Sequence, residues 1–253
     1  MDLDLFDYNL PEKNIALYPK EKGASRLLVC FKDKGNTIDE LFLNIPDYLE
    51  KNSLLVLNNS KVYNARVYFN FQDGKRGEIL ILKYKDNEME CLIKPAKKVL
   101  KEKKIKFSEE IETSLIEKKE ENTFYIRLNM PVEKLIEEKG VPPLPPYIKR
   151  QVKEDDKIWY QTIYASKTGS IAAPTAGLHF NEEILNRLKE KNIKILYLTL
   201  HVGIGTFKPI RKDKIEEHKM EEEYFEISEK LAEEIEKAKL EKRKIIAVGT
   251  TTT

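Results

Sequence analysis

The spacing of hydrophobic positions divides the chain into stretches of different character. Residues 54–57 form a short apolar run ended by an Asn-Asn pair, which is typical of a buried strand followed by a turn. From residue 66 to residue 128, short runs rich in β-branched and aromatic residues alternate with turn signals such as Asp-Gly and Asp-Asn. This alternation predicts a small antiparallel β-barrel.

A proline-rich segment, VPPLPPYI at residues 141–148, follows the β-rich region. Proline fixes φ and lacks an amide donor, so we expect an extended polyproline conformation and a domain boundary there. Residues 66–149 are therefore predicted to form an inserted β-barrel domain. Residues 1–65 and 150–253 are predicted to form a discontinuous α/β catalytic domain.

The pattern after this boundary alternates between helices and strands. Residues 181–191 carry apolar positions at helical spacing behind a capping Asn181, which predicts a helix. The run IKILYLTL at residues 193–200 is continuous and apolar, as strands buried on both faces of mostly parallel sheets are. A second helix is expected over residues 228–242, capped by its first residue, and IIAVGTTTT begins a further strand. The predicted class is α/β.

Composition indicates the cellular compartment of the protein and the kinds of partner it does not signal. A chain of 253 residues has room for two domains, and its 45 Lys and Arg nearly cancel its 43 Asp and Glu, so no global basic field indicates nucleic-acid binding. The two cysteines, Cys30 and Cys91, are far apart in sequence, which makes a zinc site or a disulfide framework unexpected and fits a reducing compartment. No stretch approaches the ~20 apolar residues that span a bilayer. We expect a soluble, cytoplasmic protein without membrane association.

Three segments rich in Gly and Thr follow strands or precede helices: GSIAAPTAGLHF at 169–180, HVGIGTF at 201–207 and VGTTTT at 248–253. In open α/β sheets, ligands bind beyond the carboxyl ends of the strands, where glycine lets the backbone approach them closely. The order of the segments predicts that they converge on one ligand site. The alternative is that their glycines only form turns.

Common motifs do not account for these segments. The string HVGIGTFK has Lys208 where a dinucleotide-binding loop needs its third glycine, and the chain has no Gly-Lys-Ser/Thr phosphate loop. His179, His201 and His218 are the only histidines, and no two have the close helical spacing of metal ligands. We therefore expect no Rossmann cofactor, no ordinary nucleotide triphosphatase activity and no metal.

A resemblance to a known family rests on seven strings that occur in the family's order and at about its spacing: FDYNLPEKNIA, SLLVLNNSKVYNARV, PPLPPYI, WYQTIYA, GSIAAPTAGLHF, TLHVGIGTFKPI and AVGTT. The whole chain resembles the S-adenosylmethionine:tRNA ribosyltransferase-isomerases of queuosine biosynthesis. The most specific feature is AAPTAGLHF joined to LHVGIGTFKP across one helix and one strand. The resemblance implies an α/β sandwich with a small inserted β-barrel.

The sequence departs from the family's pattern at three places. Glu221 stands where the family usually carries a second histidine, and Gly23 stands where an Asp is common. The family also continues beyond Thr253 through a serine-valine-arginine stretch, so the resemblance implies a C-terminally truncated chain.

The activity implied by the resemblance is unusual. The family transfers and isomerises the ribosyl moiety of S-adenosylmethionine onto 7-aminomethyl-7-deazaguanine in the tRNA wobble position, giving epoxyqueuosine and releasing adenine and methionine. The implied partners are the precursor tRNA and S-adenosylmethionine, the latter as substrate with no further cofactor, and the implied state of the full-length enzyme is a monomer. The expected path removes the acidic 5′-proton beside the sulfonium, so the site needs a base and an acid. Histidine, with an ordinary pKa of ~6.5, suits both roles.

The candidate catalytic residues are therefore His179, His201 and His218. His179 lies in a Gly-bearing loop, where its alternative role is packing at a helix start. His201 directly follows a predicted buried strand and so faces the expected crevice. His218 lies in a charged stretch, where a solvated surface position explains it equally well.

Hydroxyl groups and backbone amides of the three loops are candidate substrate contacts, with tight turns as the alternative explanation. The candidates are Thr175, Gly177, Gly203, Gly205 and Thr206. Arg66, beside a strand start, is a candidate for a bidentate phosphate or carboxylate contact, or for a structural ion pair. The Lys-rich run 94–106 is suited to RNA phosphates or to a solvated face.

Two rival functions remain open from the sequence. One is a non-catalytic RNA-binding module built around the β-barrel, and the other is a different α/β enzyme acting on a small anionic metabolite. Neither releases adenine from S-adenosylmethionine, so an adenine-release assay separates both from the favoured function.

Overall fold

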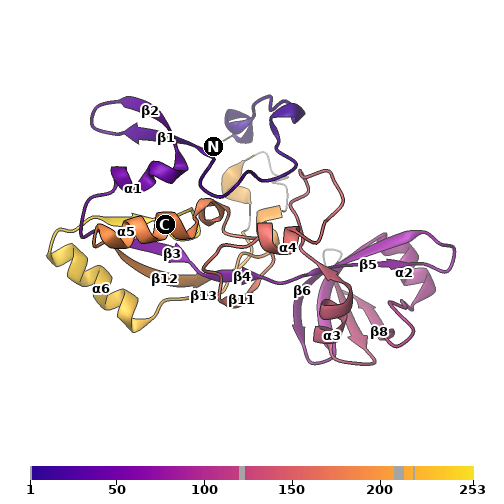
Figure 1. Cartoon of the computed structure of the whole chain (residues 1–253). Coiled ribbons are helices and arrows are strands. Elements are labelled where there is room, and N and C mark those ends of the chain that lie inside the picture. Colours follow the sequence, from indigo (N-terminus) through magenta and orange to yellow (C-terminus); the bar gives the residue numbers. More distant parts are fainter. Residues whose placement is uncertain (1, 120–122, 208–213, 219) are drawn as a thin grey trace. The chain divides into compact units, whose positions relative to one another are not determined.

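The computed structural model describes residues 2–119, 123–207, 214–218 and 220–253 (Figure 1). The fold is mixed α/β with several sheets, which confirms the predicted class. The chain divides into two compact units, and each is described by itself. The first unit comprises Met1–Lys61, Pro146–Arg150 and Ile158–Thr253, and the second comprises Val62–Pro145 and Gln151–Lys157.

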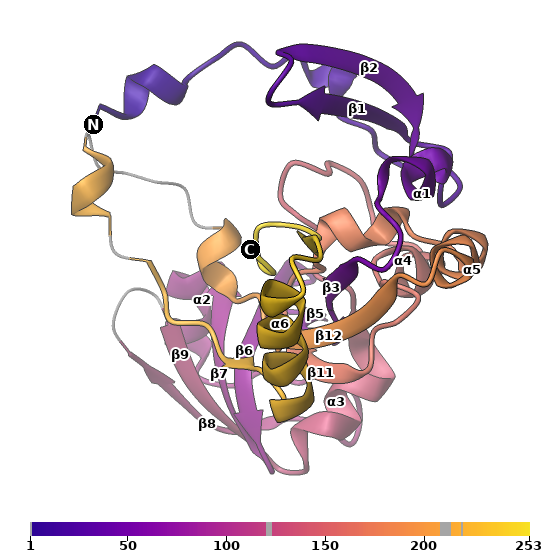
Figure 2. The same ribbon diagram turned by 90° about the vertical axis from the view of Figure 1, so that its left-hand side faces the viewer.

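The first unit is built around a four-stranded sheet of order β13-β12-β3-β14, in which β3 pairs in parallel with both β12 and β14. A separate antiparallel hairpin, β1-β2, lies earlier in the chain (Figure 2). The strands are β1 (Arg26–Phe31), β2 (Asn36–Leu41), β3 (Leu54–Asn58), β4 (Ser60–Val62), β11 (Lys167–Ser170), β12 (Lys194–Leu200), β13 (Phe225–Glu226) and β14 (Ile245–Ala247). The α-helices are α1 (Ile45–Tyr48), α5 (Glu182–Glu190) and α6 (Glu229–Leu240), and the 3-10 helices are η1 (Leu3–Phe6), η2 (Glu12–Asn14), η3 (Phe42–Asn44), η5 (Thr175–His179), η6 (Ile204–Phe207) and η7 (Ile215–Glu217). Helix α4 (Asp156–Trp159), like β4, includes residues of both units.

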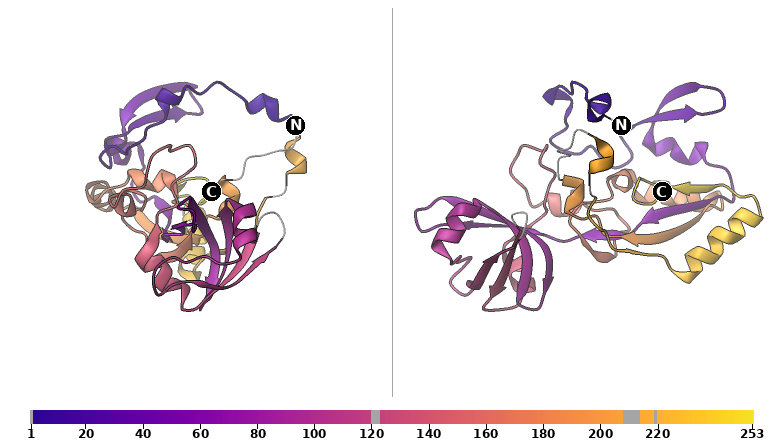
Figure 3. Two further views of the ribbon diagram at one scale, coloured as in Figure 1. Left: turned by 90° about the vertical axis from the view of Figure 1, so that its right-hand side faces the viewer. Right: turned by 180° about the vertical axis from the view of Figure 1, so that it is seen from behind.

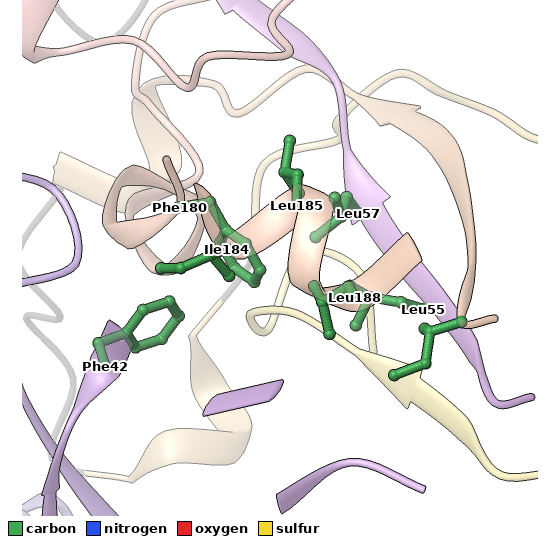
Figure 4. Packing of buried hydrophobic residues seen from close by; sticks show 8 residues of the cluster. Phe42, Leu55, Leu57, Phe180, Ile184, Leu185 and Leu188 are labelled. Atoms are coloured by element: carbon green, nitrogen blue, oxygen red, sulfur yellow. The ribbon is translucent and has the colours of Figure 1, made fainter. Parts of the chain in front are cut away.

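Strand β3 is buried along its whole length, because helices cover both faces of the sheet (Figure 1). Successive side chains of a strand point to opposite faces. Leu55 and Leu57 accordingly pack into a cluster with the buried residues of α5, as Figure 4 shows. Leu54 and Val56 pack on the other face with α6. Two-sided burial explains why this segment is a continuous apolar run rather than an alternating one.

The two predicted helices of this unit are confirmed, together with their caps. Asn181 Oδ1 accepts a hydrogen bond from Ile184 N at 2.9 Å, and Ser228 Oγ accepts one from Leu231 N at 3.3 Å. Each cap satisfies an amide that the first helical turn leaves without an intrahelical partner. Among the described residues, no helix combines the length and the apolar character needed to cross a membrane.

Two predictions about the sheet were wrong in detail. The turn expected after residue 57 is only a one-residue break at Asn59, after which the chain continues into β4. Strand β12 is not buried throughout, since only Thr199 is fully buried. The reason is that its neighbour β13 is two residues long and pairs only with Thr199 and Leu200, so the rest of β12 forms an edge.

The second unit is a six-stranded antiparallel sheet of order β10-β5-β6-β7-β9-β8. Figure 3 shows its strands in purple and magenta. Its elements are β5 (Arg66–Asn70), β6 (Arg76–Lys85), β7 (Glu88–Lys94), α2 (Ala96–Glu102), β8 (Thr113–Lys118), β9 (Thr123–Leu128), α3 (Val132–Lys139) and β10 (Gly140–Val141). Within the part of this unit that the structure describes, no ladder joins β8 to β10, so the closed barrel predicted from the sequence is not found. Strand β10 ends after two residues because prolines without amide donors follow it.

Replacing Leu188 with Ala is expected to lower the free energy of unfolding by about 2–5 kcal/mol, because the fully buried side chain leaves a cavity between α5 and β3. Leu240→Ala is the matched control. That side chain is 85% exposed on α6, and its loss should change stability by no more than about 0.5 kcal/mol. Urea unfolding of both variants measures the difference, and equal losses would contradict the packing described here.

Candidate functional site

A cavity of about 840 Å³ lies within the first unit. Its wall combines the segment before β1 with the 3-10 helix η5. Of the three predicted site residues on η5, Thr175 and His179 line the cavity. The cations Lys20, Lys22 and Arg26 line the same space. The cavity therefore joins a titratable imidazole and a hydroxyl group to several positive charges.

His179 is held at the edge of the hydrophobic core. Its ring packs against Phe42, with 5.1 Å between ring centroids, and the side chain is half-buried. Partial burial, followed by the positive charge of Lys22, lowers the pKa of His179 below its ordinary value. The imidazole is therefore predominantly neutral near pH 7, which is the form that accepts a proton.

Lys22 is fixed against the loop that carries His179. Its ammonium group donates to the carbonyl oxygens of Gln161 and Leu178, each at 3.1 Å. Its own carbonyl accepts a hydrogen bond at 3.0 Å from Nδ2 of Asn181, the residue that caps α5. Burial lowers the pKa of Lys22. Hydrogen bonds thus join Lys22 to Leu178, which precedes His179 in the chain, and to Asn181, which follows it.

Aromatic residues form another part of the cavity wall. The rings of Tyr18 and Trp159 meet edge to face, with 6.5 Å between centroids, and Tyr147 also lines the space. The Arg150 guanidinium lies 4.6 Å from the centroid of the Tyr18 ring and donates to the carbonyl of Leu17 at 2.6 Å. Aromatic walls of this kind accept planar heterocycles by stacking.

His201 lies outside this cavity wall, as far as the described residues show. Its Nδ1 is 2.7 Å from the Oγ of buried Ser60, and its ring stacks on Tyr224 with 5.5 Å between centroids. A Cβ atom on Gly169 would come within 2.5 Å of His201 Nε2, so only glycine leaves room for the ring. Burial lowers the pKa of His201, against an opposing effect of Glu226.

The three Gly- and Thr-bearing loops contact one another at the carboxyl ends of the strands. Val202 N donates to Ser170 Oγ at 2.7 Å, which joins the second loop to the first. The third loop contacts the first through Gly249, where an added Cβ would lie 3.2 Å from Ala176 Cβ. The buried Asn58 side chain donates to Thr251 Oγ1 at 3.3 Å.

Two of the backbone amides nominated for substrate contacts have internal partners in this structure. Gly177 N donates to the Pro174 carbonyl at 2.9 Å, and Gly203 N donates to a carboxylate oxygen of Glu223 at 2.7 Å. Gly205 packs beside Glu221, the residue at which the sequence departs from the family pattern. The side chain of Thr206 is exposed.

The remaining two candidates lie elsewhere. His218 follows η7, and its amide donates to the Ile215 carbonyl at 3.0 Å. Arg66 begins β5 in the second unit, and its buried Nε has no hydrogen-bond partner among the described residues. Within the described ranges, no group of three or more His, Cys, Asp or Glu side chains is arranged to hold a metal ion.

Sequence reasoning missed Lys22 and the aromatic wall. Lys22 is one of many lysines in a charged chain, and its position depends on carbonyl groups 139 and 156 residues away in the sequence. Trp159 had a usable signal, because it is the chain's only tryptophan and begins one of the family strings. Tyr18 carried no such signal.

Gly177→Ala should destabilise the loop, because the new Cβ would lie 2.2 Å from Tyr164 Oη. The expected loss is about 1–3 kcal/mol of unfolding free energy, as for other overpacked sites. Combining it with Tyr164→Phe should restore part of that loss, since the clashing hydroxyl is removed. Gly203→Ala, whose Cβ would meet nothing closer than 3.7 Å, is the control. Thermal unfolding of the four proteins tests this, and equal effects of both Gly substitutions would contradict it.

Comparison with known proteins places the chain in a family. The sequence model described as "Queuosine biosynthesis protein" matches residues 3–253. The S-adenosylmethionine:tRNA ribosyltransferase-isomerase of Treponema denticola is 44% identical over 256 residues, covering 98% of this chain and 74% of that protein. The enzyme of the same name from Aquifex aeolicus is 40% identical over 255 residues, covering 99% of this chain and 76% of that protein. A crystal structure of S-adenosylmethionine tRNA ribosyltransferase from Thermotoga maritima is 29% identical, covers 98% of this chain and 70% of that one, and has a TM-score of 0.44. The chain therefore belongs to the queuosine biosynthesis protein family.

Proposed function

We propose that this protein is an S-adenosylmethionine-dependent tRNA ribosyltransferase-isomerase. It transfers and isomerises the ribosyl moiety of S-adenosylmethionine onto 7-aminomethyl-7-deazaguanine in the tRNA wobble position, yielding epoxyqueuosine, adenine and methionine. The observation that carries this proposal is the 44% identity, over 98% of the chain, to a relative of that name. The proposal includes tRNA and S-adenosylmethionine as partners, no further cofactor, a cytoplasmic location, and a monomeric state for the full-length enzyme.

The chemistry is assigned to the cavity that contains His179. The sulfonium of S-adenosylmethionine acidifies the neighbouring 5′-carbon, so a neutral imidazole close to it can remove that proton. His179 is predominantly neutral near pH 7 because burial and Lys22 both lower its pKa. The resulting carbanion rearranges the ribose ring as adenine leaves, and protonated His179 can give its proton to the departing adenine nitrogen. The amine of the deazaguanine then attacks with loss of a proton, and the C–S bond breaks to release methionine as the epoxide closes.

The other candidate residues have distinct proposed roles. Thr175, which lines the cavity, supplies a hydroxyl to the ribose or the methionine moiety. His201 is proposed as a second proton-transfer group, oriented by Ser60. His218 is proposed as a third proton-transfer group. The further proposed substrate contacts are Gly177, Gly203, Gly205 and Thr206.

We further propose that the chain comprises an α/β sandwich, which carries the chemistry, and an inserted β domain. The helices on both faces of β3 support the sandwich assignment. The β domain, with Arg66 and the Lys-rich run 94–106, contributes contacts to RNA phosphates.

The activity is tested by incubating the protein with S-adenosylmethionine and tRNA that carries the deazaguanine precursor. Adenine release is followed by chromatography, and the modified nucleoside by mass spectrometry. A mass gain on the tRNA equal to the epoxycyclopentane unit, in step with adenine release, supports the proposal. Neither change would be seen if the protein were a non-catalytic RNA-binding module or an enzyme of another metabolite.

His179→Gln should lower the turnover of adenine release by about 10²–10⁴-fold, the loss expected on removing a general base. S-adenosylmethionine binding should survive the change. His201→Gln in the same assay shows whether His201 shares the proton transfer. Turnover near that of the wild type in the folded His179 variant would remove His179 from the mechanism.

The pH dependence of turnover should report the neutral form of His179. The base acts unprotonated, so turnover should rise with pH and level off above the pKa of His179. Because that pKa is lowered from 6.5, half-maximal turnover on the acid limb is expected below pH 6.5. A midpoint clearly above pH 6.5 at saturating substrates would contradict the assignment, and His179→Gln should abolish this limb.

A further inference from the structure

Lys22 combines partial burial with a position on the cavity wall. Two protons of its ammonium group are directed to the carbonyl oxygens of Gln161 and Leu178 at 3.1 Å. These acceptors are neutral dipoles, and no ion pair between described residues includes Lys22. The side chain thus brings a positive charge to the cavity, and no carboxylate of the described residues forms an ion pair with it.

The neighbouring charged groups make Lys22 unlike the other cations of the cavity. Arg26 is 2.8 Å from Asp39 and is largely exposed. Lys20 is exposed as well, and Glu21 is the one acidic side chain among the residues that line the cavity in the described chain. A half-buried, pre-oriented ammonium without an anionic partner is the more favourable site for an oxyanion, because less water must be displaced from it and less side-chain entropy is lost.

We propose that Lys22 binds the α-carboxylate of the methionine moiety of S-adenosylmethionine, an inference that rests on the proposed function. His179 follows Leu178, whose carbonyl Lys22 contacts, so a carboxylate on Lys22 places the sulfonium end of the substrate in the same cavity as the base. The two carbonyl contacts fix the ammonium before substrate arrives. Lys22 is then a binding residue that also positions the reacting carbon.

Two other roles for Lys22 lead to different results. If Lys22 only holds the loop in place through its carbonyl contacts, its replacement should change the affinity for a ligand with a carboxylate and for one without it equally. Binding of a tRNA phosphate is the other source of an oxyanion, and it would leave S-adenosylmethionine affinity unchanged while weakening tRNA binding. The discriminating probe is decarboxylated S-adenosylmethionine, which lacks only the carboxylate.

The experiment measures, by calorimetry, the dissociation constants of S-adenosylmethionine and of decarboxylated S-adenosylmethionine. The proteins compared are the wild type, Lys22→Met, Lys22→Gln and Lys34→Met. Lys22→Gln removes the charge but keeps an amide that can donate to the two carbonyls. Lys34 is an exposed residue of the β1-β2 turn, so Lys34→Met controls for the loss of one positive charge. Thermal unfolding of each variant establishes that it is folded.

The expected result is that both Lys22 variants bind S-adenosylmethionine about 10–100-fold more weakly, the range for a charge-assisted hydrogen bond, and bind the decarboxylated ligand as well as the wild type does. Lys34→Met should match the wild type with both ligands. Equal weakening for the two ligands, or no weakening for either, overturns the inference. The proposed function is judged separately, because its failure is the absence of adenine release from the wild type.

Discussion

The burial of β3 on both faces is the constraint on which the rest of the first unit depends. Leu55 and Leu57 anchor α5, and Leu54 and Val56 anchor α6, so one four-residue run fixes both helical layers. Burying each such side chain contributes about 1.5–3 kcal/mol, more than the roughly 0–1 kcal/mol typical of an exposed ion pair. Because β12 and β14 both run parallel to β3, their carboxyl ends, and the loops that follow them, meet at one edge of the sheet.

Asn58 converts the end of β3 into a junction between those loops. Its side chain is buried, and it donates to the Leu200 carbonyl at 2.9 Å and accepts from Leu200 N at 3.2 Å. It also accepts from Ser60 N at 3.0 Å and reaches Thr251. The amide thereby replaces the pairing that the backbone loses where the strand ends. The same junction presents Ser60 to His201.

The sequence predicted those parts of the fold that local rules decide. The cap residues and spacing of α5 and α6, and the apolar run of β3, each carry their signal within a few residues, and all three are confirmed. Strand β12 was mispredicted because its burial depends on the length of β13, which no local pattern encodes. The barrel was mispredicted for a similar reason, because closure depends on whether the first and last strands pair.

The candidate site shows the same division between local and long-range information. His179 was nominated from its loop and does line a cavity, but its protonation behaviour comes from Phe42 and Lys22, which are distant in sequence. Lys22 could not be nominated, because one lysine in a chain with 35% charged residues has no distinguishing pattern. Its character arises from two carbonyl groups that reach it only in the folded protein. Partial burial favours the neutral form of His179 but also lowers the pKa of Lys22, whereas donation to two carbonyl oxygens favours the charged form of Lys22. The packing of the 178–181 segment against residues 22–23 provides both the burial and the contact with the Leu178 carbonyl.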